Sequence, residues 1–115
     1  MDQIQVTATF PDIAPDNLDE FKQLGADILK LATEEPGVLQ YDWFFDAGEG
    51  KCVVRETFES SDAVMTHLGT VGHLVGPLAE LGGGIEIELF GSPSEQLAQA
   101  LEGFSPTCYS FFQGK

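Results

Sequence analysis

Residues 36–67, PGVLQYDWFFDAGEGKCVVRETFESSDAVMTH, contain the clearest pattern in the chain, a predicted β-hairpin followed by the start of a helix. In its first half, large apolar side chains stand at every second position, which is the period of a strand with one buried face. The residues between them are mostly polar. We therefore expect a strand that turns four apolar side chains to one side: Leu39, Tyr41, Trp43 and Phe45.

The second half of this stretch predicts a turn, a partner strand and a helix N-terminus. Residues 47–50 include two glycines, which suit a hairpin turn with positive φ. The partner strand is expected from about residue 51 to 59. Ser60, Ser61 and Asp62 then offer N-cap groups for a helix that carries His67.

Around the hairpin, the chain continues to alternate between the two kinds of pattern. Apolar residues alternate with polar ones over residues 4–10 and 85–89, which predicts two further half-buried strands. Pro15 can open a long amphipathic helix that runs to about Glu34. After the hairpin we expect two short helical segments rather than one, because Gly69, Gly72 and Pro77 interrupt the apolar stripe.

The C-terminal residues add a short helix and an aromatic tail. Residues 92–95, Ser-Pro-Ser-Glu, have the sequence of a capping box with proline at the first helical position, and Gly103 would end the helix. The tail at residues 107–113, TCYSFFQ, would expose several aromatic rings in water. We therefore expect it to dock as an extended segment on the sheet or on another subunit.

The order strand–helix–strand–strand–helix–strand predicts an α+β, ferredoxin-like βαββαβ fold with a four-stranded antiparallel sheet and both helices on one face. A single domain is expected over residues 1–115, with a core at 1–91 and the C-terminal helix and tail at 92–115. The uncovered face of the sheet would be polar but poor in lysine and arginine. A homodimer that pairs two sheet faces would explain this composition, although an ordinary hydrated face would as well. The residues expected there are Gln5, Thr7, Gln40, Asp42, Glu86 and Glu88.

Composition limits the possible partners. The formal net charge is −14, with 19 acidic against 5 basic residues, so nucleic acids and anionic membrane surfaces are unsuitable partners. We find no apolar run of membrane-spanning length and no signal peptide. Two cysteines do not make a disulfide framework, so a reduced, cytoplasmic protein is expected.

The sequence contains no strong motif for a nucleotide or a metal. The three glycines at 82–84 follow a helix and precede a strand, which is the wrong context for a phosphate loop. His67 and His73 are six residues apart and do not share a helical face, so no metal site is expected.

The remaining hypothesis is an apolar pocket between the hairpin and the following helix. Tyr41 and Trp43 would line it, and His67 would project into it from the helix. Strand register decides whether Arg55 or Glu56 faces the same side. Each residue also has a purely structural interpretation, with Trp43 as core, His67 as a backbone cap and Arg55 as a surface ion-pair partner.

The segments EPGVLQYDWFFD and VVRETFESSDAVMTHL resemble the antibiotic biosynthesis monooxygenase family, and the similarity extends from the first strand to about Leu89. The family has a dimeric α+β barrel fold. Its strand-to-helix segment is a glutamate, an aromatic residue, an acidic residue and a histidine. The residues that match the family pattern are Pro36, Gly37, Tyr41, Glu56, Phe58, Ser60, Asp62, Ala63 and His67.

This resemblance implies a small cofactor-independent monooxygenase that oxidises a quinol or a polycyclic phenol with O₂ and needs no flavin, haem or metal. His67 would be the base, Glu56 would orient it, and Arg55 would stabilise the phenolate. The substrate-binding residues would be Tyr41, Trp43, Phe45 and His73, although His73 stands one residue beyond the family spacing. Several oxygenating relatives carry an asparagine on a pocket strand, whereas the only asparagine here, Asn17, begins a helix.

Two alternative functions fit the same residues. One is a non-catalytic dimeric module that binds a small aromatic metabolite. The other is a haem-binding or haem-degrading relative, which the acidic charge and the missing strand asparagine disfavour.

Overall fold

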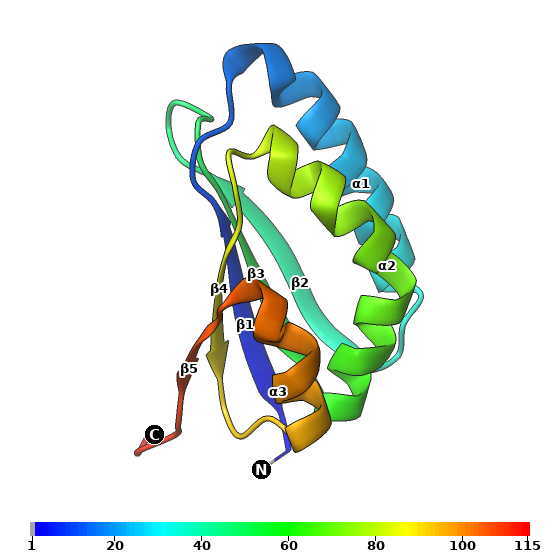
Figure 1. Ribbon diagram of the computed structural model, residues 1–115, viewed down its shortest axis with the longest axis vertical. Coiled ribbons are helices and arrows are strands. Elements are labelled where there is room, and N and C mark those ends of the chain that lie inside the picture. The colour runs from blue at the N-terminus through cyan, green and yellow to red at the C-terminus, as the bar shows by residue number, and fades with distance from the viewer. Residues whose placement is uncertain (1) are drawn as a thin grey trace.

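The structure is a computed structural model that describes residues 2–115. Its centre is a five-stranded sheet in the order β2-β3-β1-β4-β5 (Figure 1). The first four strands are antiparallel, as predicted, and have the ferredoxin-like order. The strands are β1 (Ile4–Phe10), β2 (Val38–Phe45), β3 (Cys52–Phe58), β4 (Glu86–Phe90) and β5 (Thr107–Tyr109).

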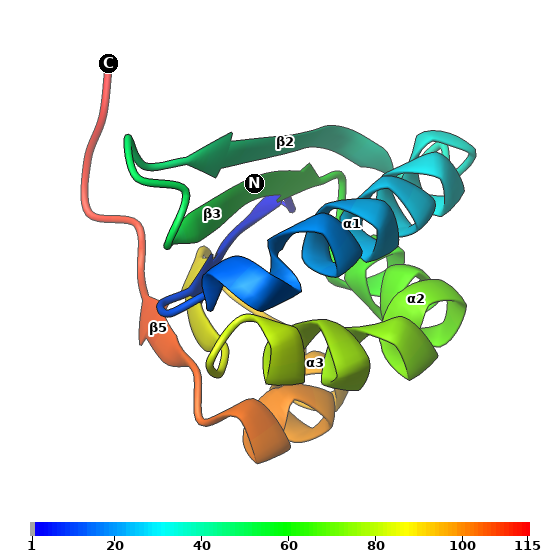
Figure 2. The same cartoon turned by 90° about the horizontal axis from the view of Figure 1, so that it is seen from above.

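Helices cover one face of this sheet, as the apolar alternation predicts. The two long helices, α1 (Leu18–Thr33) and α2 (Ser61–Leu81), run side by side over it, and α3 (Glu95–Leu101) packs beside α2 (Figures 1 and 2). Short 3₁₀ turns precede α1 at Pro15–Asn17 and follow α3 at Glu102–Phe104. The other face of the sheet is left open.

Strand β1 holds the core together because it lies between β3 and β4. Its residues alternate between buried and accessible positions, with Ile4, Val6, Ala8 and Phe10 under the helices. One buried cluster joins β1 and β3 to α1 and to the second half of α2. The other joins the first half of α2 to Leu97 and Leu101 of α3. The C-terminal helix therefore belongs to the same core.

Strand β2 departs from the predicted alternation at one position. Its pairing with β3 shifts between Val38 and Gln40, and this bulge leaves Leu39 52% exposed. Tyr41, Trp43 and Phe45 follow the prediction and lie against the helices. The prediction for Leu39 was wrong because a bulge exchanges the two faces of a strand.

The hairpin turn also differs from its prediction. Glu49, with φ 55°, adopts the left-handed conformation, whereas Gly48 and Gly50 do not. Asp46 supports this turn, since its Oδ1 accepts hydrogen bonds from the backbone N–H groups of Gly50 and Lys51. The hydrogen bonds of the Asp46 carboxylate therefore hold this turn, and the positive-φ glycines that the sequence suggested are not used.

Helix α2 is continuous, and the expected break is absent. Gly69, Gly72 and Gly76 face open space, and Pro77 is accommodated inside the helix near its C-terminal end. The buried stripe Val64, His67, Val71 and Leu78 packs on the sheet throughout. Tertiary packing therefore outweighs the local cost of the glycines and the proline.

Two C-terminal predictions need correction. The sheet has a fifth strand, parallel to β4, where an all-antiparallel four-stranded sheet was expected. Stacking of Tyr109 on Phe90, with ring centroids 5.1 Å apart, anchors this strand. Helix α3 begins two residues later than the capping box suggested, because Ser94 rather than Ser92 is the N-cap and Pro93 lies outside the helix.

The open face of the sheet is polar, as expected. Thr57 donates a hydrogen bond to Gln40, which in turn donates to Asp42, across the surface of β2 and β3. The tail after β5 leaves on this side, away from the helices (Figure 2). None of the helices in residues 2–115 is long and apolar enough to cross a membrane.

Candidate active site

His67 is the centre of a buried polar cluster between α2 and the sheet. The Ser60 hydroxyl caps α2 by accepting a hydrogen bond from the N–H of Ala63, and this fixes the start of the helix. Seven residues after the cap, His67 falls on the buried stripe and is only 4% exposed. Its ring lies 5.2 Å from the Phe58 ring and 5.0 Å from the Tyr41 ring, measured between centroids.

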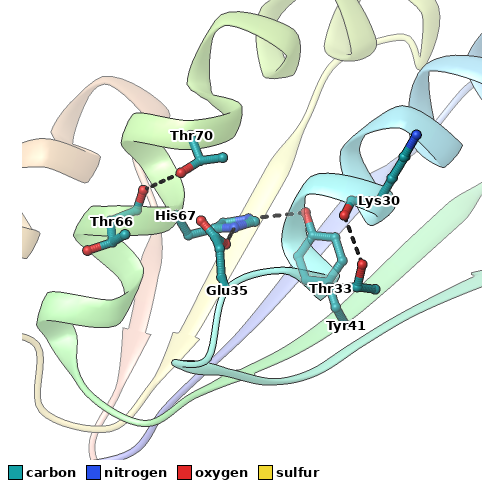
Figure 3. A network of polar contacts seen from close by, with 7 residues as sticks. All are labelled: Lys30, Thr33, Glu35, Tyr41, Thr66, His67 and Thr70. Carbon is teal, nitrogen blue, oxygen red and sulfur yellow. Dashed lines mark hydrogen bonds and ion pairs between the residues drawn. The ribbon is translucent and has the colours of Figure 1, made fainter.

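Both ring nitrogens of His67 have a partner (Figure 3). Nδ1 lies 2.8 Å from Oε2 of Glu35, and Nε2 lies 3.2 Å from the hydroxyl of Tyr41. The three side chains come from different parts of the chain, namely the α1–β2 loop, strand β2 and helix α2. Together they form a carboxylate–imidazole–phenol arrangement.

The chemistry of the partners assigns the protons in this cluster. Burial, aided by the nearby carboxyls of Glu56 and Glu35, raises the pKa of Tyr41 well above its ordinary value. Tyr41 therefore keeps its proton and donates it to Nε2 of His67. Nδ1 then carries the other proton and donates it to the Glu35 carboxylate. In this tautomer, Nε2 of His67 can accept the proton of the Tyr41 hydroxyl.

An apolar cavity of about 70 Å³ adjoins the cluster, between the sheet and the helices. His67, Tyr41, Trp43 and Glu56 supply its polar groups. For comparison, an engineered cavity that binds benzene measures roughly 150 Å³, so an aromatic ligand needs the cavity to widen. Two lining residues, Leu101 and Phe104, come from the C-terminal segment.

Glu56 lies beside this cluster, and the two hydrogen-bond partners of His67 are Glu35 and Tyr41. It is 8% exposed, and burial raises its pKa from 4.5 to about 8. The carboxyl group within hydrogen-bond distance of His67 is that of Glu35, whereas the sequence suggested Glu56 for the orienting role. Both residues are carboxylic acids, but only Glu35 has a basic partner.

Three other predicted site residues lie away from the cavity. Arg55 is exposed on the open face of the sheet, because the register turns Glu56 inward. His73 is exposed on α2 and does not line the cavity. Phe45 packs edge-to-face on Phe21 beneath α1, with ring centroids 6.1 Å apart, and belongs to the core.

Sequence analysis missed Glu35 altogether. It lies between the end of α1 and the Pro36–Gly37 pair, next to a second glutamate, Glu34. Glu34 is exposed and Glu35 is largely buried, yet the helical pattern does not separate them. The only available signal was its position directly before Pro36, where the chain turns from α1 into β2.

The described residues form no metal-binding group, and of the two cysteines Cys52 is buried and Cys108 is exposed. In residues 2–115, histidine, cysteine and acidic side chains do not gather in groups of three that could hold a metal ion. Burial raises the pKa of the Cys52 thiol to about 11, which suppresses the reactive thiolate.

Comparison with known proteins identifies the family. A family model described as antibiotic biosynthesis monooxygenase matches residues 4–76, which include every residue of the Glu35–His67–Tyr41 cluster. The chain belongs to this family. A solved structure from Caulobacter crescentus CB15, named after the same family, is 30% identical, with 81% of this chain and 92% of that chain covered and a TM-score of 0.66. No curated protein matches the chain.

Two more distant solved structures share the fold, and one of them matches nearly the whole chain. MupZ from Pseudomonas fluorescens is 20% identical and has a TM-score of 0.78, with 98% of this chain and 92% of that chain covered. SnoaB from Streptomyces nogalater, described as a cofactor-independent oxygenase, is 16% identical and has a TM-score of 0.63, with 82% and 96% covered. At these identities the likeness shows the fold alone.

Proposed function

We propose that this protein is a cofactor-independent monooxygenase that oxidises a quinol or another phenolic aromatic substrate with O₂. The observation that carries the proposal is the Glu35–His67–Tyr41 cluster beside an apolar cavity. Family membership supports it, since SnoaB, a structure of the same fold, is described as a cofactor-independent oxygenase.

In the first step of this mechanism, the substrate loses a proton. The phenolic O–H passes its proton to the Tyr41 oxygen while Tyr41 passes its own proton to Nε2 of His67. The imidazolium that forms is stabilised by the Glu35 carboxylate at Nδ1, 2.8 Å away. Glu35 remains ionised, and the phenolate remains in the cavity.

The phenolate then reacts with O₂. One electron passes from the phenolate to O₂, which gives an aryloxyl radical and superoxide. The two recombine at a ring carbon that bears hydrogen, and the peroxide formed loses water to leave a quinone carbonyl, with His67 returning its proton to the departing oxygen. The apolar lining favours this step because it keeps water away from the radicals. Tyr41 and Trp43 are placed to stack on the ring.

The test is oxygen uptake with menadiol in ¹⁸O₂, comparing wild type with His67→Gln. His73→Gln is the matched control, because His73 lies on the same helix but is exposed. We expect labelled product above the buffer blank from wild type and the control, and a rate lower by roughly 100-fold or more for His67→Gln. Equal rates for the two variants would remove His67 as the base. Absence of uptake across a panel of quinols and phenols would favour a binding module instead.

We also propose that two copies pair through the open face of the sheet. This face carries the hydrogen-bonded set Thr57, Gln40 and Asp42, and Phe44 is exposed on it. Beside it the tail exposes two further aromatic rings, with Phe112 86% accessible in a single chain. Exposed aromatic groups beside an uncovered sheet face are typical of a subunit interface.

A further inference from the structure

Glu56 is a buried acid whose position is fixed on three sides. Its strand, β3, lies between β2 and β1, and its direct partners in the sheet are Tyr41 and Val6. The alternation of β3 turns it toward the helices, into the lining of the cavity. Only 8% of its surface is exposed.

Among residues 2–115, no lysine or arginine side chain compensates a charge at Glu56. All five lysine and arginine side chains are exposed, and the nearest in sequence, Arg55, points to the opposite face. His67 is already paired with Glu35 and Tyr41. Burial raises the pKa of Glu56 to about 8.

A second polar group on the cavity lining also lacks a partner. The indole Nε1 of Trp43 is buried and makes no hydrogen bond within residues 2–115. A buried N–H donor without an acceptor is costly, and so is an ionised carboxylate without a cation. Protonation of Glu56 removes the cost of an unpaired carboxylate, and its O–H adds another hydrogen-bond donor. The Glu56 O–H and the Trp43 N–H are then two donors on the lining, whereas the other buried side-chain atom without a partner in residues 2–115, Oε1 of Glu35, belongs to a residue outside the lining.

We propose that Glu56 is a neutral carboxylic acid that donates a hydrogen bond to an acceptor oxygen of the bound ligand, with the Trp43 N–H as a second donor. The site then selects an aromatic molecule that carries a carbonyl oxygen in addition to the hydroxyl that Tyr41 and His67 deprotonate. This inference rests on the proposed function in one respect only, namely that the ligand carries a hydroxyl group. Glu56 is a specificity-determining residue in this account, and the base remains His67.

Two titratable side chains face Glu56, and its other neighbours on the cavity lining are apolar. Tyr41 faces it from β2 and His67 from α2, while β1 and β4 contribute the apolar residues Val6, Ala8 and Ile87. The carboxyl group of Glu35 is paired with Nδ1 of His67. Because no lysine or arginine side chain faces Glu56, a rise in pH above about 8 ionises it and removes the donor.

The test compares acetophenone with ethylbenzene, which has the same size but lacks the carbonyl. Binding is followed by NMR through the indole N–H signal of Trp43, which is the only tryptophan. The proteins are wild type, Glu56→Gln, which keeps a neutral donor, and Glu56→Leu, which has none. We expect the affinity ratio of acetophenone to ethylbenzene to fall by roughly five- to tenfold in Glu56→Leu and to persist in Glu56→Gln.

A pH series gives a second readout that does not need the leucine variant to fold. Acetophenone binding to wild type should weaken between pH 7 and 9, whereas binding to Glu56→Gln should not change. Equal ratios in wild type and Glu56→Leu, a flat pH profile for wild type, or no binding of acetophenone at its solubility limit would overturn the inference. Because acetophenone has no phenol to oxidise, these results are independent of whether the protein is an oxygenase.

Discussion

Glu35 and Glu56 lie in the same site but differ in charge, because only Glu35 is paired with a basic side chain. Glu35 is joined to His67 at 2.8 Å, so its negative charge is matched whenever the imidazole is protonated. Glu56 is buried without a cation, and its pKa is raised to about 8. One carboxyl is therefore suited to stabilise a positive charge, and the other is suited to remain neutral.

The raised pKa of Glu56 predicts how stability depends on pH. The folded protein holds the Glu56 proton up to about pH 8, whereas the unfolded chain releases it near its ordinary value of 4.5. Stability is therefore fully present below pH 4.5 and is lost as the pH rises to about 8. In Glu56→Gln this loss is absent.

Urea unfolding at pH 5 and pH 9 measures this difference. We expect the free energy of unfolding of wild type to fall, relative to that of Glu56→Gln, by more than about 1 kcal/mol between the two pH values. Glu59→Gln serves as the control, because Glu59 is exposed at the end of the same strand. If wild type and Glu56→Gln respond equally to pH, Glu56 is not a buried neutral acid.

The sequence predicted part of this site at the level of residues. Tyr41, Trp43 and His67 were identified because strand alternation and a helix cap place them on buried faces. Arg55 and Glu56 could not be separated, since a shift of one residue exchanges them. Glu35 was missed because its role depends on where the α1–β2 loop lies against α2, a contact between segments 32 residues apart.

At the scale of elements, close packing of α1 on β2 sets the position of the aromatic residues. Gly25 in α1 lies against the Trp43 ring, and a Cβ added there would stand 2.9 Å from Cζ3 of Trp43. A glycine inside a helix usually costs stability relative to alanine. Here the small residue is needed for the indole to fit.

We therefore expect Gly25→Ala and Gly69→Ala to have opposite effects. Gly69 lies in α2 and faces open space, so alanine there should stabilise the protein by about 0.5–1 kcal/mol. Gly25→Ala should destabilise it by about 1 kcal/mol and shift the Trp43 fluorescence, because the added methyl group overpacks the interface. Thermal unfolding of both variants gives the comparison. A stabilised Gly25→Ala protein would show that the indole moves without cost.

The elements with strong periodicity were predicted well, and those that depend on tertiary contacts were not. Strand β1 and helix α1 follow their sequence patterns. The continuity of α2 could not be predicted, because the packing of its buried stripe outweighs Gly72 and Pro77. The parallel pairing of β5 with β4 likewise depends on a contact between Phe90 and Tyr109.

At the scale of the whole molecule, the layer arrangement leaves one sheet face and the tail uncovered. The βαββαβ order was predictable, because each segment has a single buried face and the helices can bury only one side of the sheet. The other side of the sheet can be covered only by a second molecule, so the sequence of one chain does not determine what lies on it. The dimer therefore remains a prediction.

Light scattering at micromolar concentration tests the dimer. We expect a mass twice the 12.4 kDa of one chain. Thr7→Arg should reduce it to that of a monomer, because Thr7 lies on the central strand of the open face, where the new charge would be buried between the two sheets. Ala26→Arg, on the exposed side of α1, should leave the mass unchanged. A monomeric wild type would contradict the proposed interface.

The central claim is that Glu35, His67 and Tyr41 act as one proton relay, and its most direct test uses the neighbouring glutamates. Quinol-dependent oxygen uptake is measured for Glu35→Gln and for Glu34→Gln, which changes the net charge equally but at an exposed site. We predict that Glu34→Gln retains the wild-type rate and that Glu35→Gln falls by roughly tenfold or more, because the imidazolium loses its counter-charge. Equal rates in the two variants would contradict the relay.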